Sequence, residues 1–143
     1  IRVTMDKRPT SISIKTMPYP GFPTDMQPQM SILLALGDST GTIVETIWES
    51  RFQYTDELAK MGADISAHGS TAIFRGVEQL YGAPVKAHDL RAGAAMIIAG
   101  LVAEGDTEVS DIHHIQRGYE NIVEKFSKLG AKIDCITVED KDE

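Results

Sequence analysis

The sequence predicts an α/β domain in which apolar helices lie inside and β-sheets lie outside, built from two β-α-β-α-β repeats. Three observations predict it. The chain resembles itself at spacings of 64 to 68 residues, strand-like and helix-like patterns alternate within each copy, and the helix expected at 89–104 is apolar on nearly every face. A repeat of this length is a supersecondary module rather than a solenoid unit. Two modules supply too few helices to enclose such a centre, which predicts that a third is missing.

The internal repeat is marked by acidic residues, arginines and glycines at matching places. The matched pairs are Asp25 with Asp89, Gly41 with Gly105, Arg51 with Arg117, and Gly62 with Gly130. Short insertions explain why the spacing grows along the chain. We therefore predict a single partial domain over 1–143, with repeat one at about 12–77, repeat two at about 84–138, and a solvated acidic tail at 139–143.

Each element of the first repeat has its own pattern. Alternating apolar and polar residues predict an extended opening segment, and an apolar run then predicts a helix. A run rich in threonine, valine and isoleucine predicts a strand. A stripe of Tyr54, Leu58 and Met61 predicts a half-solvated second helix, which Gly62 ends as a C-cap. The expected elements are an extended segment at 12–15, helices at about 25–37 and 53–61, strands at 42–48 and 63–68, and a hairpin strand at 71–77.

The second repeat follows the same order. Its first helix carries only apolar or small residues between Arg91 and Glu104, so it must be surrounded by protein, and its alanines and glycines let other helices approach closely. Its second helix places Tyr119, Ile122 and Phe126 on one stripe with Leu129, and Gly130 ends it. The expected elements are helices at 89–104 and 118–129 and strands at 107–112 and 131–138.

Composition narrows the function classes. Fourteen basic against 21 acidic residues leave a net charge of −7, which argues against nucleic acid as a partner. The uncharged stretch 92–103, which no other exceeds in length, is too short to cross a bilayer. The single cysteine, Cys135, cannot form an internal disulfide and sits in a predicted strand, which indicates an inert buried thiol and a reducing, cytoplasmic setting. A chain that opens at Ile1 rather than methionine is expected to be a piece of a longer protein.

Asp25 follows a loop that contains three prolines, which stiffen it in extended conformations. Thr24 with Gln27 three residues later fits a capping box, which would place Asp25 in the first turn of the helix. The helix dipole favours an ionised carboxylate there, a suitable state for a general base. The alternative interpretation is that Asp25 is only a helix-start acid and the prolines only a structural stop.

Arginines form the second signal. Arg51 and Arg117 occupy matching strand-to-helix junctions, and Arg91 lies in the first turn of the apolar helix at 89–104. A cation there opposes the helix dipole and requires an anionic partner. Repeat symmetry would gather the three at one end of the domain, as a site for a multiply charged anion. The alternative is ordinary pairing with Glu49, Asp89 or Glu120.

Other motifs predict less. The four histidines and Cys135 lack metal-ligand spacing, so we predict no metal site, and no cofactor motif is present. The glycine-flanked segment 37–41 lacks the Gly-Lys-Ser/Thr of a phosphate-binding loop and is predicted to be a tight turn.

Four motifs resemble one family in order and in register. They are PYPGFPTDMQ (18–27), ETIWESRF (45–52), DLRA (89–92) and HIQRGYE (114–120). Together they resemble the C-terminal third of UDP-N-acetylglucosamine 1-carboxyvinyltransferase, the UDP-GlcNAc enolpyruvyl transferase. The sister family, 5-enolpyruvylshikimate-3-phosphate synthase, shares the fold and chemistry, but the proline-rich loop and the Arg-Gly-Tyr-Glu segment suit it less well.

The resemblance implies both a fold and a reaction. The fold is an inside-out α/β barrel of the enolpyruvyl transferase type, with three repeats in each of two domains. The reaction moves the enolpyruvyl group of phosphoenolpyruvate to the 3-hydroxyl of UDP-GlcNAc and releases phosphate, the first committed step of peptidoglycan synthesis. It needs a base, an acid and cations that hold phosphate and carboxylate.

The resemblance also implies site residues. Asp25 matches the carboxylate that contacts the sugar hydroxyl and moves protons. Arg91 and Arg117 match positions that bind the phosphoenolpyruvate side, and Arg117 is with Asp25 a catalytic candidate. Arg51 joins that cluster, and Ile47 matches a backbone contact to UDP-GlcNAc.

The family's catalytic cysteine loop, most uridine contacts and a lysine–asparagine pair lie outside this stretch of sequence. The partner implied is therefore the rest of the same chain, with its cysteine-loop domain, and the 143 residues alone are expected to be inactive. Two alternatives remain open: a stand-alone binding or scaffold domain of the same fold, and a fragment of 5-enolpyruvylshikimate-3-phosphate synthase.

Overall fold

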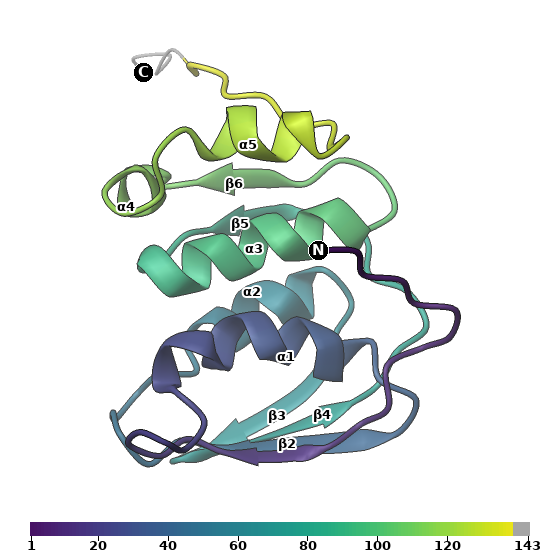
Figure 1. Cartoon of the computed structure of the whole chain (residues 1–143), viewed down its shortest axis with the longest axis vertical. Helices are drawn as coiled ribbons and strands as arrows, with labels where there is room; N and C mark the ends of the chain where they lie inside the picture. The colour runs from purple at the N-terminus through teal and green to yellow at the C-terminus, as the bar shows by residue number, and fades with distance from the viewer. Residues whose placement is uncertain (139–143) are drawn as a thin grey trace.

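A computed structural model describes residues 1–138 and places the two repeats as successive layers (Figure 1). Repeat one forms a four-stranded sheet at one end of the molecule, and repeat two forms a two-stranded sheet nearer the other. The elements are β1 (Ser13–Lys15), the 3₁₀ turn η1 (Thr24–Met26), α1 (Gln27–Ala35), β2 (Thr40–Val44), α2 (Tyr54–Lys60), β3 (Asp64–His68), β4 (Thr71–Arg75), β5 (Pro84–Lys86), α3 (Leu90–Val102), β6 (Glu108–Ser110), α4 (His113–Gln116) and α5 (Ile122–Lys128). The predicted acidic tail at 139–143 lies outside the described residues.

The sheet of repeat one has the strand order β1-β2-β4-β3, with β1 parallel to β2 and the other neighbours antiparallel. Ile43 of β2 pairs with both Ile14 of β1 and Ala72 of β4, and all three are buried. Because paired residues point to the same side of a sheet, they form one apolar face. This face, together with Phe74, packs against the helices and forms the larger hydrophobic core.

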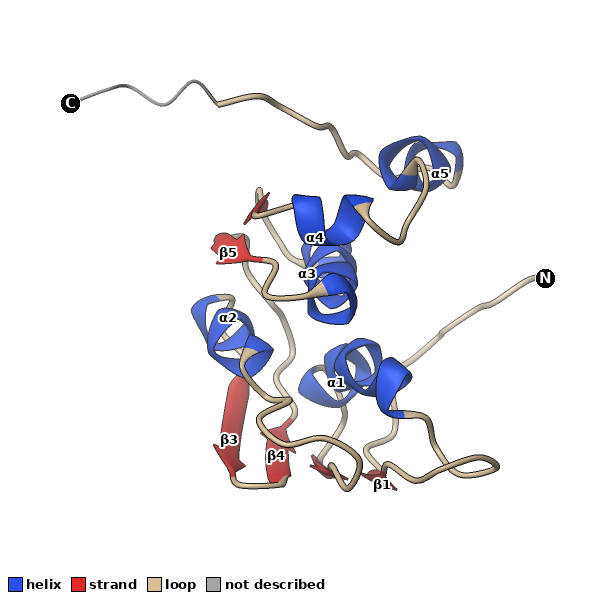
Figure 2. Cartoon of the chain, turned by 90° about the vertical axis from the view of Figure 1, so that its left-hand side faces the viewer, coloured by secondary structure: helices blue, strands red, loops and turns tan. Residues whose placement is uncertain are grey.

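The inner helices pack against one another, with the strands on the periphery (Figure 2). α3 contacts α1, α2 and α4. At Gly93 a Cβ atom would lie 2.5 Å from Cγ1 of Ile115, so the absent side chain is what lets α3 and α4 approach this closely. The predicted layering, with apolar helices inside and sheets outside, is confirmed. The inner helices still expose some apolar side chains, namely Leu33 of α1 and Leu101 and Val102 at the end of α3.

The longest helix in residues 1–138 has 13 residues, and none of the described helices is long and apolar enough to cross a membrane.

Both predicted glycine caps are confirmed. Gly62 and Gly130 adopt φ values of +92° and +97°, which favour glycine. In each case the glycine amide bonds the carbonyl three residues before it and the next amide bonds the carbonyl five residues before itself. This double pattern is a Schellman motif, so the second helix ends in the same way in both repeats.

The second repeat departs from its predicted elements at three places. The helix expected at 118–129 is present but begins later, as α5 (Ile122–Lys128), because Asn121 takes a left-handed conformation at φ +49° just before it, and the short helix α4 (His113–Gln116) precedes it where no helix was predicted. The segment 131–138 is extended but forms no strand, and Leu129 is 82% exposed. Cys135, predicted to be a buried thiol in a strand, is exposed.

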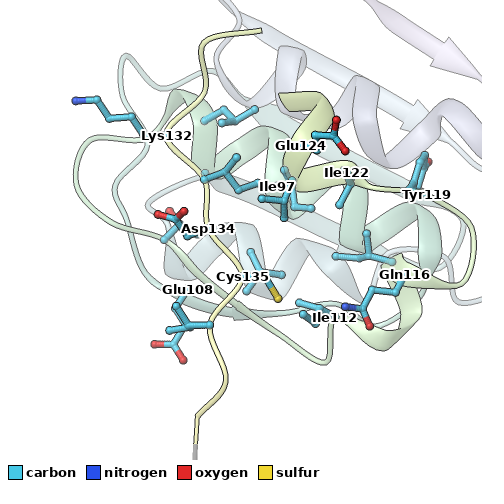
Figure 3. Close-up of a pocket in the computed structure, with 18 of the residues that line it drawn as sticks. Ile97, Glu108, Ile112, Gln116, Tyr119, Ile122, Glu124, Lys132, Asp134 and Cys135 are labelled. Atoms are coloured by element: carbon cyan, nitrogen blue, oxygen red, sulfur yellow. The ribbon is translucent and has the colours of Figure 1, made fainter. Parts of the chain in front are cut away.

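The missing strand has a physical cause that repeat one reveals. There, β4 lies between β2 and β3 and bonds to both. In repeat two the corresponding place is an open cavity of about 1320 Å³, lined by β6 on one side and by residues 132–136 on the other (Figure 3). A strand needs a neighbour to satisfy its backbone donors and acceptors. No described residue supplies that neighbour, so 131–138 stays unpaired.

Glu57 of α2 joins the two repeats. Its side chain is 6% exposed, and its carboxylate accepts bonds from Lys60 Nζ at 2.8 Å and from the Lys86 amide of β5 at 3.0 Å. Oε1 lies 3.2 Å from Nε2 of His88. Burial raises the pKa of Glu57, but these hydrogen bonds outweigh it and hold the pKa below its ordinary value.

The lowered pKa of Glu57 predicts acid sensitivity. A carboxyl with a depressed folded-state pKa stabilises the fold above its unfolded pKa, and that contribution is lost as pH falls through the folded value. We expect Glu57→Gln to cost about 1–3 kcal/mol of unfolding free energy at pH 7. The difference from the unsubstituted chain should shrink between pH 5 and pH 3. Urea unfolding followed by circular dichroism across this range measures it.

Asp64→Asn is the matched control for this titration, because Asp64 pairs with Arg75 on the open surface. We expect it to cost less than about 1 kcal/mol. A Glu57→Gln curve that ran parallel to that of the unsubstituted chain from pH 7 to pH 3 would contradict the assignment.

Candidate active site

The predicted site residues lie at the end of the molecule where α1 and α3 begin. Figure 2 looks onto this end, and shows the starts of the two helices beside each other with α4 next to α3. The loop between β2 and α2, which carries Ile47 and Arg51, runs along the same end (Figure 1). The arrangement therefore follows from both repeats placing their inner helices in the same direction.

Asp25 lies in η1, the 3₁₀ turn that leads into α1, with its side chain 59% exposed. The predicted capping box is wrong. Pro23 occupies the N-cap of η1 with no side-chain bond, and Thr24 Oγ1 donates instead to Glu45. Gln27 likewise turns inward, where it is fully buried. Neither flanking side chain caps the helix, because both are held by the interior of the domain.

Asp25 and its repeat counterpart Asp89 do different things. Asp89 is the N-cap of α3, and its Oδ1 accepts bonds from the Arg91 and Ala92 amides at 2.8 and 2.9 Å. This bond pattern stabilises the helix start. Asp25 makes no such cap. Its Oδ1 lies 2.5 Å from Nε of Arg91, so the carboxylate of repeat one reaches the guanidinium of repeat two.

The Asp25–Arg91 pair is the centre of the candidate site. The hydrogen bond that Arg91 donates to Asp25 raises the pKa of Arg91, against a smaller opposing effect of burial, so the guanidinium is charged at every working pH. The predicted alternative, in which Arg91 pairs with Asp89, is wrong, because Arg91 pairs with Asp25, while the Asp89 carboxylate bonds the backbone amides of the helix start. Both side chains of the pair remain accessible, at 34% exposure for Arg91.

Arg117 lies on the segment that covers the start of α3. It follows α4 and is exposed, and the next residue, Gly118, packs on Leu90 so closely that a Cβ would lie 2.7 Å from Cδ1 of that leucine. The contact places the Arg117 segment next to the first turn of α3. In the described part of the chain, Asp25 forms an ion pair with Arg91 and with neither Arg117 nor Arg51.

Arg51 and Ile47 lie on the loop that follows β2. The guanidinium of Arg51 sits 5.4 Å from the ring centre of Trp48, within cation–π range. Trp48 is 58% exposed and Ile47 is 37% exposed, so the loop presents apolar surface to solvent beside a cation. A ligand with both a flat or apolar part and an anionic part suits such a surface.

Glu45, at the same end of the molecule, was not among the predicted site residues. It is 3% exposed and accepts hydrogen bonds from Thr16, Thr24 and the Ile47 amide. Burial raises its pKa, but these hydrogen bonds outweigh burial and leave the pKa lowered. A signal was present, because Gly41, Ile43 and Glu45 alternate as core-facing positions and so place a carboxylate on the buried face.

The arrangement can bind an anion and accept a proton. Arg91, Arg117 and Arg51 offer guanidinium groups suited to phosphate or carboxylate, and Asp25 offers a carboxylate on a short 3₁₀ turn. The large cavity beside β6 includes Arg117 but neither Asp25 nor Arg91. That cavity is therefore a gap in the second sheet and not the centre of the candidate site.

Comparison with known proteins identifies a family and a set of relatives. Residues 1–126 match the family EPSP synthase (3-phosphoshikimate 1-carboxyvinyltransferase). The chain is 61% identical over 121 residues to a UDP-N-acetylglucosamine 1-carboxyvinyltransferase of Clostridium botulinum, with 85% of this chain and 29% of that protein covered. It is 55% identical over 133 residues to UDP-N-acetylglucosamine 1-carboxyvinyltransferase 3 of Symbiobacterium thermophilum, with 93% and 31% covered. The chain thus spans about a third of the relatives it matches.

Solved structures agree with the fold. The enolpyruvyl transferase NikO from Streptomyces tendae superposes with a TM-score of 0.80 at 31% identity, covering 87% of this chain and 29% of that one. An EPSP synthase from Acinetobacter baumannii superposes with a TM-score of 0.54 at 23% identity, covering 68% and 26%. The second likeness shows a shared fold alone.

Proposed function

This chain belongs to the EPSP synthase (3-phosphoshikimate 1-carboxyvinyltransferase) family, and from that premise we propose that it is part of an enzyme that transfers the enolpyruvyl group of phosphoenolpyruvate to the 3-hydroxyl of UDP-GlcNAc. The Asp25–Arg91 pair carries the proposal, because it joins a carboxylate and a guanidinium at the start of two inner helices. The choice of sugar nucleotide rests on relatives of 50–61% identity that bear that substrate in their names.

The reaction divides into an addition and an elimination. In the addition, the sugar hydroxyl attacks C2 of the enolpyruvyl group while a base takes the hydroxyl proton and an acid protonates the methylene carbon. In the elimination, a proton leaves the new methyl group and the C2–O bond to phosphate breaks, which regenerates the double bond. The site must therefore supply a base near the hydroxyl and cations around phosphate and carboxylate.

The residues of this chain fit separate parts of that reaction. Asp25 is the proposed base at the sugar hydroxyl, and Ile47 is the proposed backbone contact to the sugar nucleotide. Arg91, Arg117 and Arg51 are the proposed cations for phosphoenolpyruvate. Arg91 bonds Asp25 in the free protein, so an anionic substrate that engages Arg91 would weaken this pair and leave the carboxylate free to accept a proton.

The remainder of the full-length protein is the proposed partner. The gap beside β6 supports this, because it has the position that β4 occupies in repeat one and lacks a strand among residues 1–138. A further segment of the chain would complete this sheet, and a second domain with the cysteine loop would close the site against water. The expected setting is the cytoplasm, in peptidoglycan synthesis.

Phosphate release by the full-length protein tests the proposed function. With phosphoenolpyruvate and UDP-GlcNAc together, we expect phosphate release and an enolpyruvyl ether of the sugar nucleotide detectable by mass spectrometry. Phosphoenolpyruvate alone and phosphoenolpyruvate with shikimate 3-phosphate serve as controls. Release with shikimate 3-phosphate instead would establish the sister activity, and no release with either acceptor would leave the domain as a binding or scaffold module.

A further inference from the structure

Glu45 is a buried carboxylate that the proposed reaction does not use. It lies directly after β2, at 3% exposure. Burying an ionised carboxylate is costly unless hydrogen bonds replace its water. Here they do, since Glu45 accepts bonds from the side chains of Thr16, Thr24 and Gln27 and from the amides of Ile47 and Trp48.

The two oxygens of Glu45 face different parts of the candidate site. Oε2 accepts from Thr24 Oγ1 at 2.8 Å and from Gln27 Nε2 at 3.4 Å, the residues on either side of the Asp25 turn. Oε1 accepts from the Ile47 amide at 2.9 Å and the Trp48 amide at 3.3 Å. A single carboxyl group thus connects the segment that carries the proposed base to the segment that carries the proposed sugar contact.

Neighbouring groups hold this carboxylate in one orientation. The Thr16 hydroxyl donates to Oε1 at 2.7 Å and also accepts the Thr46 amide at 2.9 Å, which ties Glu45 to the end of β1. The buried Tyr54 hydroxyl donates to Oε1 of Gln27 at 2.7 Å. That bond turns the amide nitrogen of Gln27 toward Glu45.

We propose that Glu45 is a positioning residue that fixes the Asp25 turn and the Ile47 loop at a set separation, so that base and sugar contact act on one bound substrate. The inference rests on the proposed function, because that function makes Asp25 the base and Ile47 the sugar contact. The hydrogen bonds through which Glu45 joins the two segments do not depend on that function, since they are present in the free chain. Positioning of this kind matters since a displacement of about 1 Å can cost 10²-fold in rate.

Replacing the Glu45 carboxylate with an amide should affect its bonds to the Ile47 loop and its bonds to the Asp25 turn differently. Glutamine keeps one acceptor oxygen and gains a donor nitrogen. The backbone amides of Ile47 and Trp48 can only donate, so the oxygen stays with them and the nitrogen turns toward Thr24 and Gln27. There it meets the amide nitrogen of Gln27, donor against donor. Glu45→Gln should therefore loosen the Asp25 turn while leaving the Ile47 loop held.

Steady-state kinetics on the full-length protein tests the inference. We expect Glu45→Gln to lower kcat by about 10- to 100-fold, with a change in KM for UDP-GlcNAc of less than about threefold because the Ile47 contact is retained. Glu57→Gln is the matched control, as it removes another buried, hydrogen-bonded carboxylate of the same repeat that does not contact the candidate site. Its kcat should stay within about twofold of the unsubstituted enzyme.

A double variant separates positioning from a general loss of stability. If Glu45 acts through Asp25, adding Glu45→Gln to Asp25→Asn should lower the residual rate by less than about twofold, since the positioned group is already gone. Equal losses of kcat in Glu45→Gln and Glu57→Gln, or full additivity in the double variant, would overturn the inference.

Amide hydrogen exchange on the 143-residue chain tests the positioning role of Glu45 without measuring enzyme activity. In Glu45→Gln we expect the Met26 and Gln27 amides of the Asp25 turn to exchange at least about tenfold faster, with those of β4 unchanged. If the unsubstituted full-length protein releases no phosphate, the proposed function fails while this exchange result still decides the structural claim. Unchanged exchange at Met26 and Gln27 would overturn it.

Discussion

Replacing Asp25 with asparagine is expected to lower kcat of the full-length protein by about 10²- to 10⁴-fold, the contribution usual for a general base. The amide keeps the size of the side chain and removes its capacity to accept a proton. Asp25 is 59% exposed and its pair with Arg91 is accessible to water, so the variant should remain folded. Phosphate release at saturating phosphoenolpyruvate and UDP-GlcNAc measures the loss, with thermal unfolding recorded alongside.

Asp56→Asn is the control for this prediction. Asp56 is also an exposed carboxylate in the first turn of a helix, α2, but it lies outside the candidate site. We expect its kcat to match that of the unsubstituted enzyme. Retention of more than about a tenth of kcat in Asp25→Asn would show that this carboxylate is not the base.

Phe74→Ala is expected to have the largest effect on stability, at about 3–5 kcal/mol of unfolding free energy. Phe74 is fully buried on β4, where it belongs to the core between the four-stranded sheet and the inner helices. Alanine leaves a cavity that the surrounding backbone cannot close, because β4 is bonded to strands on both sides. A domain of this size has a total stability of about 5–15 kcal/mol, so the loss is a large part of it.

Urea unfolding of the 143-residue chain followed by far-ultraviolet circular dichroism measures the Phe74 effect. Ile73→Ala is the matched control, since Ile73 is the preceding residue of β4, points to the other face and is only half-buried. It should cost clearly less than Phe74→Ala. Equal costs for the two variants would contradict the assignment of the inner face of β4 to the core.

Local sequence patterns predicted most of repeat one and the glycine cap of repeat two correctly. The strands β3 and β4, the two-residue turn at Gly69 and the caps at Gly62 and Gly130 each depend on residues close together in the chain. Their conformational preferences act over one turn or one hairpin, so they can be recognised without knowledge of the rest of the fold. The family resemblance added the fold type, which the structure confirms.

The predictions that proved wrong depended on distant partners. Residues 131–138 have the pattern of a strand, but a strand forms only beside another, and repeat two lacks the neighbour that β4 provides in repeat one. Cys135 is exposed for the same reason. The pair Thr24 and Gln27 has capping-box spacing, yet both side chains bond the buried Glu45 instead.

The amino-acid sequence by itself determined the repeat, the order of helices and strands, the apolar inner helices and the residues able to bind an anion, because these depend on periodicity and residue type. The tertiary structure alone decided that Asp25 pairs with Arg91 from the other repeat, and that Asp89 caps a helix instead. It also decided that Glu45 joins the Asp25 turn to the Ile47 loop. Asp25 and Arg91 are 66 positions apart, and Thr24 and Glu45 are 21 positions apart. Only the packing of the inner helices and the first sheet brings such distant partners within bonding distance.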